Sequence, residues 1–474
     1  MELSIPYGIS ERISRIRFNR QIQIPAWILC LLALLVNNGF YLFICMVTLL
    51  ILIRLLWFQR HPGIIMFAFF MQWVQVVGFV WWMMSLGFEV DRVSPNAPLA
   101  IILSCIGLVL MAVVLNLRIR PLGMPSIEYL QAEALKINDK KLLLLYVIST
   151  ALLTSAGFVF GITSGFAQIL TSVSDLKWLF MLWYGYVVWI KRKNRIYLLY
   201  IAVYEFAAGF YSFFSSFKEV LFFIIILLIT FIVRIKGKQL IGAILTCAVF
   251  IWLFLSWIVI KGDYRQFLNQ GTRKQAVHVT REEAYTKVFE QVSNLSMDNY
   301  RLSLNTGLYR VQYVYHFALA IDRVPALMPY QNGQVWLDNI TFVLTPRLLF
   351  PDKEIYDASI KTSKFTGRRF AGQQQGASFS LGYFADAYVD FGPIWMFIPI
   401  ILIGFFVSAI YRTFYKMENL NVFLRFAIIN VVLYVFISFE SDGLFLFGRL
   451  FIGSLTFFIL AKTVFPALQR WVYK

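Results

Sequence analysis

Uncharged hydrophobic blocks recur along the whole chain. Three of them, Ile101–Leu115, Val220–Val233 and Leu240–Ile260, contain no charged residue. With their flanking turns, such blocks approach the ~17–25 residues that match the hydrocarbon thickness of a bilayer. Polar and apolar positions do not alternate within them, as they would in the strands of a membrane β-barrel. Because backbone amides in lipid must be satisfied within the segment, the pattern predicts transmembrane α-helices.

The blocks predict an all-α polytopic membrane protein with about twelve transmembrane helices. The first helix is short because Asn37, Asn38 and Gly39 interrupt the apolar run. The expected helices lie near residues 24–38, 40–58, 63–86, 98–116, 142–165, 176–190, 196–215, 220–233, 239–261, 393–411, 420–439 and 444–461.

Lys and Arg residues gather at alternate ends of these helices. On one side they lie at Arg12–Arg20, Arg60, Arg118, Arg120, Lys140, Lys141, Lys191–Arg195, Arg234–Lys238, Arg412, Lys416 and Lys462–Lys474. The short connections on the opposite side carry Glu89, Asp91, Asp175, Glu219, Glu440 and Asp442. By the positive-inside rule, both termini are expected in the cytoplasm.

One connection is much longer than the others. The chain divides into helices one to nine at residues 1–261, a large loop at 262–392 and the last three helices at 393–474. The loop falls on the outer, periplasmic side, and we expect it to contain short helices. Arg281–Val292 and Gly307–Leu327 both have apolar residues spaced by three and four, and the second is predicted to lie flat in the membrane interface. A smaller cytoplasmic amphipathic run covers Ile127–Leu135.

Composition agrees with a membrane protein. Of the 474 residues, 59% are hydrophobic and only 14% are charged, against roughly 25% charged residues in soluble domains. The net charge of +18 is explained by the basic helix ends and does not require nucleic acid as a partner. All four cysteines lie inside apolar blocks, so no disulfide framework is expected. The basic stretch from Arg12 to Arg20 has no cleavage site after it and is expected to be retained.

No motif of a soluble enzyme is present. There is no phosphate-cradling glycine loop, zinc-ligand spacing or nucleophile elbow. His61, His278 and His316 are the only histidines and lie far apart in the sequence, so no metal or cofactor is expected. Glu205 falls in the middle of a predicted helix, where it is expected to face the bundle interior as a hydrogen-bond partner or part of a cavity.

Charged residues instead gather at the predicted outer membrane face. They are Lys218, Glu219, Arg265, Arg310, Arg347, Asp352, Lys353, Asp386, Asp390, Glu440, Asp442 and Arg449. A single Lys or Arg at an interface commonly only extends toward lipid headgroups, and a single carboxylate can simply cap a helix. Several cations and carboxylates at one depth instead suit an anionic headgroup such as a lipid pyrophosphate, because Arg offers paired donors to phosphate oxygens.

Two runs in the loop are similar to motifs of a known family. Pro346-Arg347-Leu348-Leu349-Phe350-Pro351-Asp352-Lys353 resembles a motif in the periplasmic loop of the O-antigen polymerases, the Wzy-type oligosaccharide repeat-unit polymerases. The stretch from Ala385 to Gly392 resembles a family run of the form Glu-Ala-Tyr-x-Asn-Phe-Gly, with Asp386 in place of the Glu and Asp390 in place of the Asn. Phe214–Lys218 resembles a Ser-Gly-x-Lys hairpin that lacks its Gly here, and Tyr264-Arg265 after the ninth helix also fits.

The resemblance implies a GT-C-like membrane glycosyltransferase of the bacterial inner membrane. Such an enzyme joins undecaprenyl-pyrophosphate-linked oligosaccharide repeat units into a surface polysaccharide at the outer face. The substrate would be a lipid-linked oligosaccharide, and a chain-length regulator would be its protein partner.

The leaving group of this reaction is a pyrophosphate, which needs neutralising charge more than a proton. Our candidates for binding it are Arg265, Arg347, Arg310, Lys218 and Lys353. Asp386 is the first candidate for the general base that activates the acceptor hydroxyl, followed by Glu219, Asp352 and Glu440.

Other functions remain open at this point. An O-antigen ligase has the same helical plan and donor but transfers to lipid A core. A polysaccharide flippase or transporter would carry charges at mid-membrane and an internal repeat, of which only Glu205 gives a hint. A structural membrane scaffold is the third alternative.

Overall fold

A computed structural model describes residues 20–159, 174–211, 217–232, 237–271, 277–345, 350, 353, 356–372 and 378–473. The structure is 79% helical, and the described residues form no β-strand beyond a single bridge between Ile137 and Tyr473. The helices of the first half are α1 (Arg20–Leu32), α2 (Gly39–Leu56), α3 (Ile64–Leu86), α4 (Ala97–Ile119), α5 (Ile127–Lys136), α6 (Asp139–Val159), α8 (Leu176–Lys191), α9 (Ile196–Phe210), α10 (Phe217–Phe231) and α11 (Gly237–Leu268). Those of the second half are α12 (Arg281–Ser293), α13 (Met297–Val311), α14 (Val314–Arg323), α15 (Gln334–Leu344), α16 (Ala358–Thr366), α17 (Tyr383–Trp395), α18 (Phe397–Tyr415), α19 (Val422–Val432), α20 (Gly443–Thr463) and α21 (Phe465–Val472).

Within the described residues, six helices are long and apolar enough to cross a membrane. The fold is therefore all-helical, as predicted, with the long apolar helices that a membrane protein requires. The ranges of these six spans are Gly39–Leu56, Ile64–Leu86, Ala97–Leu122, Ile244–Leu268, Phe397–Tyr415 and Gly443–Thr463.

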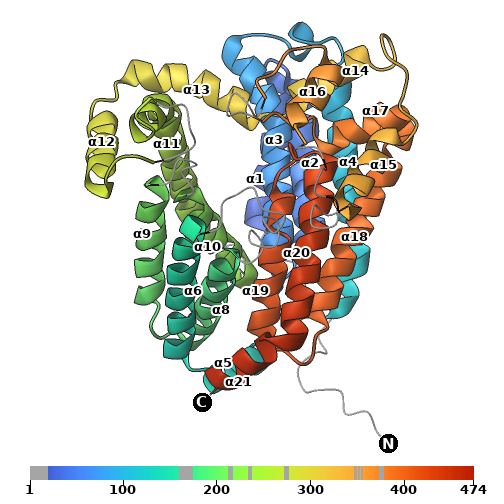
Figure 1. Ribbon diagram of the computed structural model, residues 1–474. Helices are drawn as coiled ribbons and strands as arrows, with labels where there is room; N and C mark the ends of the chain where they lie inside the picture. The colour runs from blue at the N-terminus through green and yellow to red at the C-terminus, as the bar shows by residue number, and fades with distance from the viewer. Residues whose placement is uncertain are drawn as a thin grey trace, which may run out of the picture.

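The long helices stand side by side in two groups (Figure 1). One group contains α2, α3, α4, α18, α19 and α20, and the other contains α6, α8, α9, α10 and α11. The groups meet mainly where α8 packs against α19 and α10 against α3. The loop helices α13–α17 lie at one end of the molecule, whereas α5, α21 and the C-terminus lie at the other (Figure 1).

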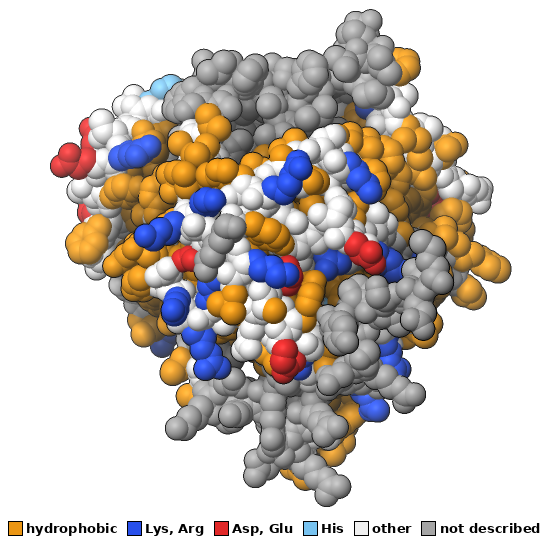
Figure 2. Space-filling model, turned by 90° about the horizontal axis from the view of Figure 1, so that it is seen from below, with side chains coloured by type: hydrophobic (Ala, Val, Ile, Leu, Met, Phe, Trp, Pro, Cys, Tyr) orange, Lys and Arg blue, Asp and Glu red, His pale blue; other side chains and the backbone are white. Residues whose placement is uncertain are grey.

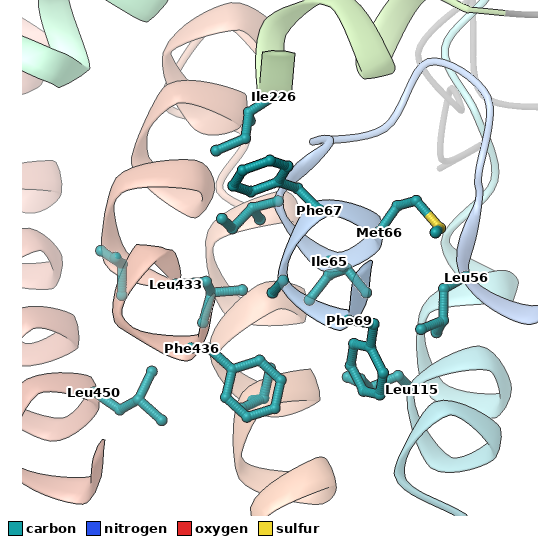
Figure 3. Packing of buried hydrophobic residues seen from close by; sticks show 14 of the residues in the cluster. Leu56, Ile65, Met66, Phe67, Phe69, Leu115, Ile226, Leu433, Phe436 and Leu450 are labelled. Carbon is teal, nitrogen blue, oxygen red and sulfur yellow. The ribbon is translucent and has the colours of Figure 1, made fainter. Parts of the chain in front are cut away.

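The core of the first group, with the part of α10 that packs against it, consists of large apolar side chains. Figure 3 shows part of it, with Leu56 of α2, Phe69 of α3, Leu115 of α4, Ile226 of α10 and Leu450 of α20, each at most 1% exposed. Lipid tails are as apolar as these side chains, so the helices gain their association from close packing rather than from exclusion of water. A rigid bundle of this kind can hold a site at its end in fixed geometry.

Basic side chains bind helix ends at the end that carries α5 and α21. Arg60 donates to Pro125 O over 2.9 Å, and Lys191 reaches Asp139 at 3.1 Å. Lys141 donates to Trp471 O over 2.7 Å. Figure 2 shows further Lys and Arg side chains spread over this face. The described part of the predicted basic side thus forms one end of the molecule.

The structure differs from the predicted helices in the long loop. The helix α11 continues to Leu268, so Arg265 lies within its last turns and not after its end. The expected single helix from Gly307 to Leu327 is wrong: α13 ends at Val311, Gln312 is extended, and α14 begins at Val314. It does not lie flat at a surface either, because α14 is buried against α4, α16 and α17. The predicted helices at Arg281–Val292 and Ile127–Leu135 are confirmed as α12 and α5.

Candidate functional site

Asp386 lies in the first turn of α17 and is completely buried. Its Oδ2 atom accepts hydrogen bonds from Lys361 Nζ at 2.9 Å, from Gly443 N at 2.8 Å and from Asn339 Nδ2 at 3.3 Å. No described residue donates to its Oδ1 atom. One oxygen is therefore saturated by donors that fix the carboxylate, and the other is left for a ligand, because an unpaired buried acceptor is costly.

Lys361 connects Asp386 to a second buried carboxylate. Its ammonium lies 2.9 Å from Asp386 Oδ2 and 3.2 Å from Asp442 Oδ2. Asp442 also accepts from the Tyr356 hydroxyl, and its Oδ1 caps α20 by accepting from Phe445 N at 3.0 Å. Since both oxygens of Asp442 are occupied, this residue positions Lys361 rather than reacting itself.

Burial and charge set the protonation states in this pair. Burial raises the pKa of Asp386, and the charge of Asp442 raises it further, while Lys361 opposes both. Burial lowers the pKa of Lys361, but the two carboxylates outweigh that effect and hold its pKa above its ordinary value. Lys361 is thus a cation that favours the ionised form of Asp386, although the pKa of Asp386 stays above its ordinary value.

Three more buried polar atoms near this pair lack partners among the described residues. They are the hydroxyl of Tyr313, Nε1 of Trp336 and Nδ1 of His316. The charges of Glu440, Asp386 and Asp442 all act on the Tyr313 hydroxyl, and the ring of Tyr313 lies 5.2 Å from that of His316. Burial lowers the pKa of His316 to about 4, so its ring is neutral. A ligand with hydroxyl groups could accept hydrogen bonds from the Tyr313 hydroxyl and Trp336 Nε1 and donate one to Asp386 Oδ1.

Four cations form a cluster where α10, α11 and α13 meet. The positive charges of Arg265, Arg310 and Lys218 all act on Lys261, and Arg310 also acts on Arg265. Lys261 and Arg265 are four residues apart on α11, so they share one face of the helix. Like charges repel, and a cluster of four is therefore a ready site for an anion.

A glycine permits the approach that completes this cluster. A Cβ atom at Gly307 of α13 would lie 2.9 Å from the end of the Ile258 side chain of α11, which would have to shift to make room. The missing Cβ lets α13 lie directly on α11, and Arg310 follows one turn later. Close packing of the two helices is consistent with the effect of the Arg310 charge on Arg265.

Glu440 links the cation cluster to the buried carboxylates. The charge of Lys218 acts on Glu440, and that of Glu440 acts on the Tyr313 hydroxyl. Glu440 is in the turn that precedes Asp442, and its side chain is exposed. Charge interactions therefore run from Lys218 to Glu440 and from Glu440 to Tyr313, on which Asp386 also acts.

Glu219 belongs to a neighbouring polar cluster. The charges of Lys177, Lys218 and Arg449 act on it. In the same cluster, Lys177 pairs with Glu205 at 2.8 Å. Glu205 also accepts from Tyr146 at 2.7 Å, which confirms the predicted role of Glu205 as an interior hydrogen-bond partner.

The remaining predicted residues have different environments. Lys353 donates to Thr345 O over 2.8 Å and to Phe342 O, so its ammonium closes the C-terminal end of α15. Arg347 and Asp352 lie outside the described residues, and their roles stay predictions. Asp390 is helical and shares a face with Asp386 as predicted, but its two oxygens accept from Val335 N and Trp336 N and thus cap α15.

Sequence reasoning missed Lys361 and Lys261. Lys361 is 25 residues from Asp386 in the chain, and nothing in the pattern of α16 distinguishes it from other basic loop residues. Lys261 stood at the expected end of a helix, where a basic residue reads as a lipid-headgroup contact. Its spacing of four from Arg265 was the available signal, but it becomes informative only when α11 is known to continue beyond it.

Two comparisons with known proteins find nothing, and one finds a family. A family model described as a domain of unknown function (DUF8712) matches residues 123–465. No curated protein and no solved structure matches the chain.

Proposed function

Because the chain belongs to the DUF8712 family of unknown function, we propose its activity from the site: a membrane glycosyltransferase that uses a lipid-diphosphate-linked oligosaccharide. The observation that carries the proposal is that charge interactions connect a group of cations with a group of buried carboxylates. The charges of Lys218, Arg265 and Arg310 all act on Lys261. The charge of Lys218 also acts on Glu440, and the charges of Glu440 and Asp386 both act on Tyr313.

Each group has one chemical task. The cations bind the diphosphate and stabilise the negative charge that it gains as the bond between sugar C1 and the phosphate oxygen breaks. Asp386 Oδ1 accepts the proton of the acceptor hydroxyl while that hydroxyl oxygen forms the new bond to C1. The released diphosphate keeps the bonding electron pair, so the reaction needs no oxidant or reductant.

The resemblance of the loop motifs to O-antigen polymerases supplies the specific form of this activity. The protein would join undecaprenyl-pyrophosphate-linked repeat units into a surface polysaccharide. Arg347 and Asp352, in the Pro346–Lys353 run, would add to the diphosphate site and to the candidate bases. The alternative acceptor, lipid A core, would make the protein an O-antigen ligase.

The proposed topology follows from the charge pattern. Six further helices cross the bilayer together with the six long apolar ones, which makes about twelve spans in a GT-C-like arrangement. These six are α1, α6, α8, α9, α10 and α19. Both termini and the basic end lie in the cytoplasm of the bacterial inner membrane. The loop helices and the site then lie on the periplasmic side, where a lipid-linked substrate presents its headgroup.

A complementation experiment tests the cation cluster. Arg310→Ala is introduced into a strain that lacks the chromosomal gene, and surface polysaccharide length is compared with that of Arg301→Ala. Arg301 is a matched control because it lies on the same helix and is highly exposed beside Asp298. Arg310→Ala is expected to shorten or abolish long chains, and Arg301→Ala to retain them. Normal chains from Arg310→Ala at normal protein level would refute the diphosphate assignment.

The lipids that accumulate in the deletion strain separate the two acceptors. A polymerase leaves single repeat units on the lipid diphosphate, whereas a ligase leaves long lipid-linked polymer. If neither accumulates and the purified protein does not consume lipid-diphosphate-linked saccharide, the glycosyltransferase proposal fails.

A further inference from the structure

A pocket of about 400 Å³ opens at the point where α17 gives way to α18. Its lining includes Tyr330, Asn332, Asp390, Phe391, Gly392 and Trp395. The volume lies in the range of pockets that hold small organic ligands, which is about 300–1,000 Å³. None of the functional groups assigned above uses it.

The walls of this pocket are fixed by the backbone. Gly392 has φ 73°, which breaks the helix, and a Cβ atom there would lie 3.0 Å from the ring of Tyr330. Asn332 N donates to Asp390 O over 3.0 Å and so ties the opposite wall to α17. The aromatic ring of Tyr330 therefore rests on a kink that only glycine accommodates.

The lining is mainly aromatic and includes one carboxylate, that of Asp390. Tyr330, Phe391 and Trp395 contribute ring faces, and the Asn332 amide side chain is exposed at the rim. Both oxygens of the Asp390 carboxylate accept backbone N–H groups of α15, so this carboxylate is held in place as a cap of that helix. No Lys or Arg is among the described residues that line the pocket, so its chemistry does not suit a phosphate. Ring faces pack against the C–H face of a pyranose, and an amide binds the hydroxyl groups at its edge.

The pocket adjoins the proposed catalytic site. Asp390 and Asp386 are one turn apart on α17, or about 6 Å along the axis. Trp336 separates the two: its backbone N–H binds Asp390, and its ring lies 3.4 Å from the place of a Cβ atom on Gly443. Trp395 lies two residues before the span that begins at Phe397, at the level of the membrane surface. The sugar of a lipid-linked saccharide would lie at this level.

We propose that this pocket is a saccharide subsite that binds a neutral sugar ring of the lipid-linked substrate beside Asp386. The proposal rests on the proposed function for its substrate class. Its occupant is a pyranose, held between the aromatic faces, that keeps the rest of the chain in register with the catalytic carboxylate.

Direct binding tests the subsite without requiring turnover. The full-length protein is placed in lipid nanodiscs, because sugar-headed detergents would compete. The probe is the saccharide mixture released by mild acid from the lipid-linked pool of the cells of origin, and binding is measured by saturation-transfer NMR. Trp395→Ala is expected to weaken binding about tenfold, as the loss of an aromatic contact does. The matched control is Ile398→Ala, which removes an exposed apolar side chain of α18 outside the pocket.

The outcomes separate the subsite from the activity. Equal binding by wild type, Trp395→Ala and Ile398→Ala would overturn the subsite. A second result would also overturn it. If phospholipids with brominated acyl chains quench the fluorescence of Trp395 and added saccharide does not relieve this quenching, a lipid fills the pocket. Saccharide binding that depends on Trp395, in a protein that transfers no sugar, would retain the subsite and reject the proposed function.

Discussion

Replacing Asp386 by Asn tests the centre of the proposed mechanism. Asn retains the shape of the side chain and can still accept from Gly443 N, but it cannot take a proton from an acceptor hydroxyl. A positioned general base contributes about 10²–10⁴-fold to a rate, so Asp386→Asn is expected to lower sugar transfer by that factor. Lys361 retains Asp442 at 3.2 Å, and the lost charged hydrogen bond is expected to cost about 1.5–3 kcal/mol of stability.

The assay measures both effects on the purified protein. Transfer is followed by the release of lipid diphosphate from a radiolabelled lipid-linked saccharide, and stability by thermal unfolding in the same membrane mimic. Asp338→Asn is the control, since Asp338 is an exposed carboxylate on α15 that accepts a hydrogen bond from Gln334 Nε2. A variant at Asp386 that remains folded and retains more than about a tenth of the wild-type rate would refute its role as base.

Three further predictions follow from the same site. Lys218→Ala is expected to lower the transfer rate about tenfold or more, because it removes a charge-assisted contact to the diphosphate, and Lys218→Arg is expected to recover part of the rate. The transfer rate is measured at low and high salt, and an unchanged rate would exclude Lys218 from the anion site. The charge of Asp442 raises the pKa of Asp386, and activity requires the ionised base. As the pH is lowered, the Asp442→Asn variant is therefore expected to lose activity at a lower pH than the wild type does. A shift of this loss to higher pH would contradict the electrostatic coupling. Gly443→Ala places a Cβ atom 2.7 Å from Asn339 Nδ2 and 3.3 Å from Asp386 Oδ2, and this variant is expected to abolish transfer. In the control Gly453→Ala, on the same helix, the new Cβ atom meets nothing within 4 Å, and the variant is expected to stabilise α20 by about 0.8–1 kcal/mol at unchanged activity. Equal effects of the two variants on transfer would contradict the steric argument.

The apolar pattern determined much of this fold before any coordinates were considered. Uncharged blocks located the long helices, because a segment in lipid must satisfy its own backbone hydrogen bonds. The spacing of Asp386 and Asp390 correctly predicted that they share one helical face. The pattern could not separate their roles, because the donors that occupy Asp390 come from α15 and those on Asp386 come from α15, α16 and α20.

Only the tertiary structure decided which charges meet. Lys361 reaches Asp386 and Asp442 from a different helix. The charge of Arg310 acts on Arg265 across two helices that pack closely at Gly307. The break between α13 and α14 likewise depends on packing, since α14 has an amphipathic pattern that suits either a membrane surface or a protein core. Local sequence specifies which faces are apolar, but the partner that covers each face is set by contacts between residues distant in the chain.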